Sequence, residues 1–242
     1  MQTFAIDTQG LTKFSKSGFR VKNIDLKVPE GCVYGFLGPN GAGKTTTMKL
    51  LLGLIKADSG SIRFFGDDVT DANRFAMNSL TGSLIESPGY YGHLTGMENM
   101  EIIARYKGAD ADSVIEALKT VRLYEKRGQR VKEYSLGMKQ RLGIAMALVG
   151  KPRILILDEP TNGLDPAGIQ EIRNLIRDMP RSLGCTVIVS SHLLSEIEQM
   201  ADHVGIIRRG EMIYQGTLAG LEKNGRSLEE VFLEMTGEGA AV

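Results

Sequence analysis

Length, composition and charge narrow the class of protein. The chain has 242 residues, which suits one large domain or one domain with an inserted lobe. Basic and acidic residues both number 29, so the formal net charge is zero, which argues against a general nucleic-acid-binding protein. The start of the chain lacks a signal peptide, and no run approaches the roughly eighteen apolar residues of a membrane-spanning helix. We therefore expect a cytoplasmic chain that reaches a membrane only through a partner.

Strands and helices alternate along the chain. Roughly the first 30 residues carry the pattern of short strands joined by turns. Near-continuous apolar runs at residues 33–37 (VYGFL), 153–158 (RILILD) and 186–191 (TVIVSS) are typical of parallel strands that are buried on both faces. The alternation predicts an α/β fold with a mostly parallel central sheet and helices on its faces.

Two helices are predicted beside these strands. The first begins near residue 44, and its buried stripe consists of Met48, Leu50, Leu51, Leu52, Leu54 and Ile55. The second begins with Asp165 as its N-cap and Pro166 in its first turn. Its inner face consists of Ile169, Ile172, Leu175, Ile176 and Met179.

Residues from about 90 to 150 show consecutive helical patterns without an intervening strand, which indicates a helical lobe inserted into the α/β core. We expect a single domain over residues 1–242. Residues 1–85 and 151–242 would form the core with an N-terminal antiparallel β subdomain, and about 90–150 would form the helical subdomain. Residues 226–237 read as a final amphipathic helix.

A phosphate-binding loop is predicted between the strand at 33–37 and the helix that follows it. Residues 38–45, GPNGAGKT, fit the pattern GxxxxGK[ST]. Glycines allow the backbone to wrap closely and to point N–H groups inward, and the helix N-terminus adds partial positive charge. Lys44 would reach the β- and γ-phosphates, and the Thr45 hydroxyl would ligate Mg²⁺. The candidate nucleotide contacts are Gly38, Pro39, Asn40, Gly41, Ala42, Gly43, Lys44, Thr45 and Thr46.

Two acids end the strand at 153–158. Acidic residues at the carboxyl end of a buried parallel strand lie where open α/β sheets bind their ligands. Asp158 would hold the metal through water, and Glu159 would orient and deprotonate an attacking water.

A helix start between these two elements carries a resemblance to a known family. Residues 134–138, YSLGM, followed by KQR, are similar to the LSGGQ motif of the nucleotide-binding subunits of ABC transporters. Ser135 and Gly137 match that motif, whereas Leu136 and Met138 depart from it. Ser135 would cap the helix, and the first-turn N–H groups would favour an anion. The resemblance covers nearly the whole chain.

The resemblance implies a head-to-tail dimer, of two such chains or of this chain with a paralogue, with two ATP molecules in the interface. Ser135 and the amide of Gly137 would contact the γ-phosphate bound by the second copy, and the loop at 162–165, with Asp165, would cross the interface. His192, just past a strand end, would hydrogen-bond the γ-phosphate and help to place the attacking water.

The resemblance also suggests a metal ligand and an adenine contact. Glu86 stands where the family usually has a glutamine that ligates Mg²⁺ and senses the γ-phosphate, and a carboxylate is the stronger Mg²⁺ ligand. Relatives stack an aromatic side chain of the N-terminal strands on the base. Phe14 and Phe19 are the candidates here, of which we favour Phe14.

Glu86 and the SLGMKQR form resemble the branch that exports lantibiotics, bacitracin-like peptides and related antibiotics. This implies an ATPase at the inner face of the membrane, bound to a separate permease. A cytosolic permease helix would lie beside residues 88–98, with Tyr90, Tyr91 and His93 as contacts.

Two other functions remain open at this point. A soluble ABC ATPase for chromosome maintenance or translation usually needs a long coiled-coil insertion or a second cassette. A P-loop kinase does not explain the helix-start motif and the strand-end histidine together.

Overall fold

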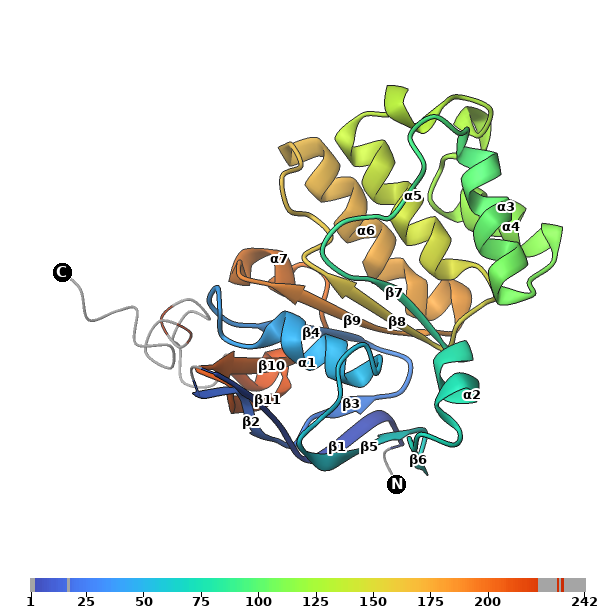
Figure 1. The fold of residues 1–242 in the computed structure, drawn as a ribbon. Helices are drawn as coiled ribbons and strands as arrows, with labels where there is room; N and C mark the ends of the chain where they lie inside the picture. Colours follow the sequence, from blue (N-terminus) through green and yellow to red (C-terminus); the bar gives the residue numbers. More distant parts are fainter. Residues whose placement is uncertain (1–2, 17, 222–229, 231, 233–242) are drawn as a thin grey trace.

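The centre of the molecule is a six-stranded sheet in the order β11-β10-β4-β9-β8-β7 (Figure 1). The computed structural model describes residues 3–16, 18–221, 230 and 232, and their side chains apart from that of Phe19. Neighbouring strands are parallel except at the β10–β11 edge, where they are antiparallel. The strands are β4 (Val33–Leu37), β7 (Thr81–Leu84), β8 (Ile154–Asp158), β9 (Thr186–Ser191), β10 (His203–Arg208) and β11 (Glu211–Thr217). The predicted α/β class and its buried parallel strands are confirmed.

A second, antiparallel sheet comes from the N-terminal part of the chain. Its order is β2-β1-β5-β6, and β3 pairs with β1 beside this path. β1 is a single strand of 12 residues, longer than the short strands that the sequence predicts. The strands are β1 (Phe4–Ser15), β2 (Gly18–Ile24), β3 (Lys27–Pro29), β5 (Ser59–Phe64) and β6 (Asp67–Asp68).

Helix α1 (Lys44–Leu51) fills the space between the two sheets (Figure 1). Met48, Leu50 and Leu51 are buried in one apolar cluster with residues of both sheets. Burial of such side chains contributes about 1.5–3 kcal/mol each, so this cluster fixes the start of α1 relative to β4.

The predicted stripe of α1 is wrong at its far end. The helix stops at Leu51, and Gly53, which has a φ of 67°, turns the chain away from the helical direction. Leu54 is therefore 62% exposed instead of buried. The periodic pattern continues past the helix in the sequence because it cannot register this turn.

Three helices form a lobe on one side of the central sheet, at the top of Figure 1. They are α3 (Gly96–Lys107), α4 (Ala111–Thr120) and α5 (Leu136–Leu148), which lie between β7 and β8 in the sequence. Two 3₁₀ turns, Tyr124–Lys126 and Val131–Glu133, connect α4 to α5. The consecutive helical patterns predicted for this region are confirmed.

The remaining helices are α2 (Arg74–Ser79), α6 (Pro166–Leu183), α7 (Leu194–Glu198) and α8 (Leu218–Leu221). Asp165 caps α6 as predicted, because its Oδ1 accepts a hydrogen bond of 3.1 Å from the amide of Gly168. In α6, Ile172, Ile176 and Met179 are fully buried, and Ile169 and Leu175 are half-buried. The helix predicted at 226–237 lies outside the described residues except for Glu230 and Phe232, both helical.

The two cysteines, Cys32 and Cys185, are both buried, and they form no disulfide with each other. Burial raises the pKa of the Cys32 thiol to about 12 and that of the Cys185 thiol to about 11. Neither thiol is therefore ionised at neutral pH. Within the described residues, no helix has the length and apolar character needed to span a membrane.

Candidate active site

The loop between β4 and α1 is shaped by glycines. Gly43 has a φ of 113°, and a Cβ there would come within 2.8 Å of the Arg20 carbonyl oxygen. A Cβ at Gly38 would collide with the carbonyl oxygen of Ile207. Gly43 is also the N-cap of α1 and offers no side-chain oxygen, so no side chain caps the first-turn N–H groups. The loop and the helix start therefore form an anion-binding turn, as the sequence predicts.

Lys44 reaches back over this loop. Its side chain is 4% exposed, and its ammonium donates to the carbonyl oxygens of Gly38 at 2.7 Å and Pro39 at 3.3 Å. The same Nζ lies 3.4 Å from Glu159 Oε1. Lys44 and Glu159 thus face each other across the loop, one on α1 and the other just past β8.

Asp158 is joined to both neighbouring elements. It is 3% exposed, its Oδ2 accepts from Thr45 Oγ1 at 2.7 Å, and its Oδ1 accepts from Ser190 Oγ at 2.6 Å. A hydroxyl and a carboxylate oxygen side by side are the hard donors that Mg²⁺ takes in small number from proteins, with water and phosphate completing its shell. The donor set of Thr45 and Asp158 therefore fits Mg²⁺.

Ser190 is a site residue that the sequence did not reveal. It is fully buried in β9, where its Oγ donates to Asp158 and accepts from the Glu159 amide at 2.9 Å. Glu159 has a φ of 46°, a conformation that costs a non-glycine residue about 1 kcal/mol or more. The Ser190 contact holds the Glu159 backbone in that turn and aims the side chain toward α1.

Glu159 and His192 lie side by side, just past the ends of the neighbouring strands β8 and β9. Glu159 Oε2 lies 3.3 Å from His192 Nδ1, and the two side chains are 24% and 37% exposed. His192 Nδ1 is buried and has no hydrogen-bond partner in the described part of the chain. Both groups are therefore partly open to a bound molecule while being held against each other.

A cavity of about 200 Å³ opens beside Glu159 and the loop that precedes α1. Besides Glu159, its lining consists of Arg20, Asn40, Gly41, Gly43, Lys44, Thr45 and Thr46. Arg20 was not among the predicted contacts, because a single basic residue in a strand carries no spacing signal. Arg20 adds a second positive charge to the lining besides Lys44, and this charge favours an anionic ligand.

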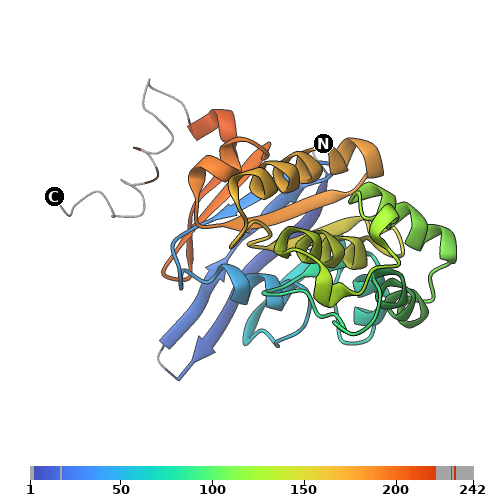
Figure 2. The same cartoon turned by 90° about the horizontal axis from the view of Figure 1, so that it is seen from above.

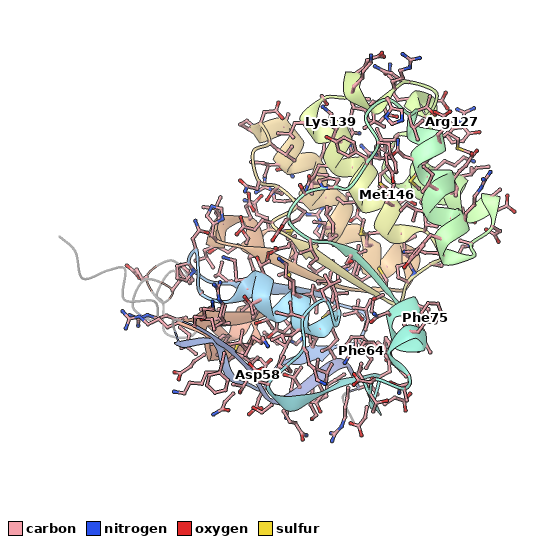
Figure 3. All side chains as sticks on the ribbon, viewed as in Figure 1. Asp58, Phe64, Phe75, Arg127, Lys139 and Met146 are labelled. Carbon is pink, nitrogen blue, oxygen red and sulfur yellow. The ribbon has the colours of Figure 1, made fainter. Side chains whose placement is uncertain are left out.

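Ser135 and Gly137 do not line this cavity. Ser135 caps α5 as predicted, with its Oγ accepting from the Met138 amide at 3.2 Å. Lys139, in the first turn of α5, lies high on the lobe and far from α1 (Figure 3). The contact of Ser135 and Gly137 with a nucleotide therefore stays a prediction.

Neither Phe14 nor Glu86 lines this cavity. Phe14 is 52% exposed near the tip of the β1–β2 hairpin, and its amide donates to Asp58 Oδ2 at 2.6 Å. The side chain of Phe19 lies outside the described part of the chain. Glu86 Oε1 lies 2.6 Å from Lys49 Nζ, one turn beyond Thr45 on α1. The adenine contact of Phe14 and the metal contact of Glu86 stay predictions.

A glycine-rich loop at a helix start, facing acids at the end of an adjacent parallel strand, is the arrangement of the P-loop nucleoside triphosphate hydrolases. The fold and the site together assign the chain to that class.

The chain belongs to the ABC transporter family. The profile of the family described as ABC transporter matches residues 21–162. The bacitracin transport ATP-binding protein BcrA of Enterococcus faecalis is 45% identical over 228 residues, which cover 94% of this chain and 74% of BcrA. The lantibiotic transport ATP-binding protein SrtF of Streptococcus pyogenes is 44% identical over 212 residues, covering 88% of this chain and 89% of SrtF.

A solved structure gives the same assignment. The dimeric, post-hydrolysis structure of the ATP-binding cassette MJ0796, bound to ADP and Pi, superimposes with a TM-score of 0.78 at 25% identity, covering 88% of this chain and 98% of that one. The resemblance to this family, and within it to the bacitracin and lantibiotic branch, is thereby confirmed. The chain binds ATP and is an ATPase of an ABC transporter. No finding favours the soluble ABC ATPase or the P-loop kinase.

Proposed function

We propose that this chain powers an exporter of peptide antibiotics of the bacitracin and lantibiotic kind, with a separate membrane permease as its partner. The observation that carries the proposal is the 45% and 44% identity to ATP-binding proteins named for bacitracin and lantibiotic transport. The chain would act at the inner face of the membrane, through the permease. Residues 1–242 would form one ABC ATPase domain, with 1–85 and 151–242 as its core and about 90–150 as its helical subdomain.

Within one copy, we propose the following division of roles. The loop at 38–45 and Lys44 bind the ATP phosphates, and Thr45 and Asp158 hold Mg²⁺, which when bound offsets the phosphate charge. Glu159 takes the proton of the attacking water, and His192 positions that water at the γ-phosphate. The 3.3 Å approach of these two side chains supports this division, because Glu159 lines the cavity beside Lys44 and His192 lies next to Glu159.

The second copy completes the site. Ser135 and Gly137 of a second chain would contact the γ-phosphate head-to-tail, and Asp165 and its loop would cross the interface. Two features support this proposal. Lys139, in the first turn of α5, lies far from α1 of the same chain, and the related cassette MJ0796 is dimeric in its post-hydrolysis structure.

The contacts of the permease with residues 88–98 stay a prediction, and a cavity elsewhere on the chain offers a further docking surface. A cavity of about 740 Å³ opens between α2 and the far end of α3, and Tyr90, Tyr91 and His93 do not line it. Its rim carries Leu54, Phe75 and Tyr106, whose side chains are 62%, 90% and 88% exposed. Figure 3 shows Phe75 on α2, below the helical lobe. Large apolar side chains gathered around a hollow are typical of a protein-binding surface, and an apolar cytosolic helix of the permease fits it.

The docking proposal predicts a separation of activities. Replacing Phe75 and Tyr106 together with serine is expected to weaken binding to permease-containing membranes at least tenfold, because about 1.4 kcal/mol of apolar contact suffices for that. ATP binding by the purified chain is expected to stay within about twofold. Ile102→Ser, on α3 but outside the cavity lining, is the matched control. Equal membrane binding by all three chains would contradict the docking site.

Glu86→Gln tests the acid that departs from the family. Glu86 is 66% exposed in its pair with Lys49, so the free energy of unfolding is expected to change by less than about 1 kcal/mol. We expect ATP affinity to be retained and the coupling of hydrolysis to transport to change. The measurement is ATPase activity and peptide export in membranes. Unchanged values of both would remove any special role for Glu86.

Reconstitution tests the function as a whole. The chain is combined in vesicles with a membrane protein encoded beside it that has about six apolar segments of ~20 residues. Candidate peptides of the bacitracin and lantibiotic kinds are expected to stimulate ATP hydrolysis and to be moved across the bilayer. Full activity without any membrane partner, and no response to these peptides, would contradict the proposal.

A further inference from the structure

A buried carboxylate outside the site joins the two loops that carry Glu159 and His192. Glu196, on α7, is 5% exposed. Its Oε2 accepts hydrogen bonds from Thr161 Oγ1 at 2.7 Å and from Ser191 Oγ at 3.1 Å. Thr161 lies two residues after Glu159, and Ser191 lies directly before His192. One oxygen atom therefore links the loop after β8 to the loop after β9.

Helix α7 holds this carboxylate in place. The helix lies beside β4 and β9 (Figure 1), and Ile197 is fully buried in the core. Ile197 packs so closely on Gly35 of β4 that a Cβ at that glycine would collide with it. Glu196, the preceding residue, is thus anchored to the same sheet that carries the site.

The hydroxyl of Ser191 passes this anchor on to the backbone around His192. While it donates to Glu196, its Oγ accepts from the Leu193 amide at 3.0 Å. The histidine is therefore fixed on both sides, before it by Ser191 and after it by Leu193. Ser190 makes the parallel connection to Asp158 and Glu159.

Burying a carboxylate is unfavourable unless hydrogen bonds replace its hydration. Within the described part of the chain, Glu196 forms no ion pair, and its hydrogen-bond donors are the hydroxyl groups of Thr161 and Ser191. An apolar side chain would fill such a place at lower cost. The acid is thus accounted for by the two loops that it connects.

We propose that Glu196 is a positioning residue that holds the loop at 159–165 and the loop of His192 in one fixed relation. This rests on the proposed function, in which Glu159 and His192 act on ATP and the loop at 159–165 lies at the dimer interface. Movement of that loop when a second copy docks would pass through Thr161, Glu196 and Ser191 to His192. The position of the His192 side chain would then depend on whether the second copy is bound.

NMR signals of the His192 imidazole test directly whether Glu196 positions this histidine. The chain has three histidines, so NMR signals of the His192 ring are assigned by comparison with His192→Ala. In the full chain, Glu196→Ala is expected to shift the His192 signals and to leave those of His93 and His203 in place. Glu196→Gln keeps an oxygen acceptor and is expected to restore the shift toward that of the natural chain. Glu198→Ala, an exposed acid on the same helix, is the matched control.

The kinetics of ATP hydrolysis are the second measurement. Glu196→Ala is expected to lower kcat about tenfold or more with KM for ATP within about twofold, because displacement of an acting group affects the reaction and not binding. In a His192→Ala background the same change is expected to have little further effect, since the histidine through which it acts is gone. If Glu196→Ala fails to fold, Thr161→Val and Ser191→Ala test the same two hydrogen bonds.

Unmoved His192 signals in Glu196→Ala, or effects of Glu196→Ala and His192→Ala that simply multiply, would overturn the proposal. Failure of the proposed function looks different. In that case His192→Ala itself would leave kcat unchanged, whereas the NMR shift caused by Glu196→Ala would still be seen.

Discussion

Glu159→Gln is expected to stop ATP hydrolysis while ATP stays bound. Glutamine has nearly the same size and keeps an oxygen near His192 Nδ1, which lies 3.3 Å from Glu159 Oε2. The amide cannot accept the proton of the attacking water. Loss of a general base typically costs about 10²–10⁴-fold in rate, and we expect kcat to fall within that range.

The affinity of the Glu159→Gln chain for ATP, in contrast, is not expected to fall. The negative charge 3.4 Å from Lys44 Nζ is removed, so the lysine is freer to face the phosphates, and the Kd for ATP is expected to stay equal or to fall. The variant should accumulate as an ATP-bound dimer. Single-turnover kinetics with labelled ATP measure both steps, with Glu171→Gln, an exposed acid on α6, as control. Hydrolysis at the normal rate would show that Glu159 is not the base.

Lys44→Ala is expected to lose most of the affinity for ATP. The ammonium is almost fully buried and already lies on the carbonyl oxygens of Gly38 and Pro39, so binding of phosphate there requires little rearrangement. Charge-assisted hydrogen bonds of this kind contribute about 1.5–3 kcal/mol, which corresponds to roughly 10–100-fold in Kd.

Lys49→Ala is the matched control for Lys44→Ala. Lys49 lies on the same helix and pairs with Glu86 at 2.6 Å, outside the cavity lining. Its loss is expected to change the Kd for ATP by less than about threefold, because its charge is already balanced and partly exposed. Titration with fluorescent ATP measures all three chains. Tight binding by Lys44→Ala would contradict the role of the loop.

The sequence predicted those parts of the site whose signals are local. The glycines at 38–43 are needed by the turn itself, and a strand before it and a helix after it are visible as apolar patterns. The capping roles of Ser135 and Asp165 are likewise decided within four residues. Each could be predicted because the backbone geometry next to it determines the residue type.

The parts that were missed depend on contacts between distant segments. Ser190 meets Asp158 across 32 positions, and Glu196 meets Thr161 across 35. Neither a serine in an apolar strand nor an acid in a short helix belongs to a local sequence pattern that predicts such a distant partner. The wrong burial of Leu54 has a related cause, since a single glycine turn ended the helix before its apolar pattern did.

The cavity that we propose as the permease docking surface also could not be read from the sequence. Tyr90, Tyr91 and His93 stand together in the sequence, whereas the cavity brings Leu54, Phe75 and Tyr106 from three separate segments. Exposure of a large apolar side chain is a property of the folded molecule. It becomes visible only when the neighbours of each side chain are known.

Cross-linking between two chains tests the composite nucleotide site most directly. One Glu159→Gln chain carries Asn40→Cys, at the cavity, and another carries Leu136→Cys, next to Ser135; both positions are exposed. The natural thiols are buried, with pKa values raised to about 12 and about 11, so they do not compete for a short cross-linker. A chain with Leu54→Cys in place of Leu136→Cys is the control.

A cross-linked pair of one Asn40→Cys chain and one Leu136→Cys chain is expected with Mg·ATP, and not with ADP or with the control. That result would place the start of α5 of one molecule at the phosphates bound by another. The account would be contradicted if no such product formed with Mg·ATP and the natural chain hydrolysed ATP at a specific rate independent of its concentration, as a single molecule would.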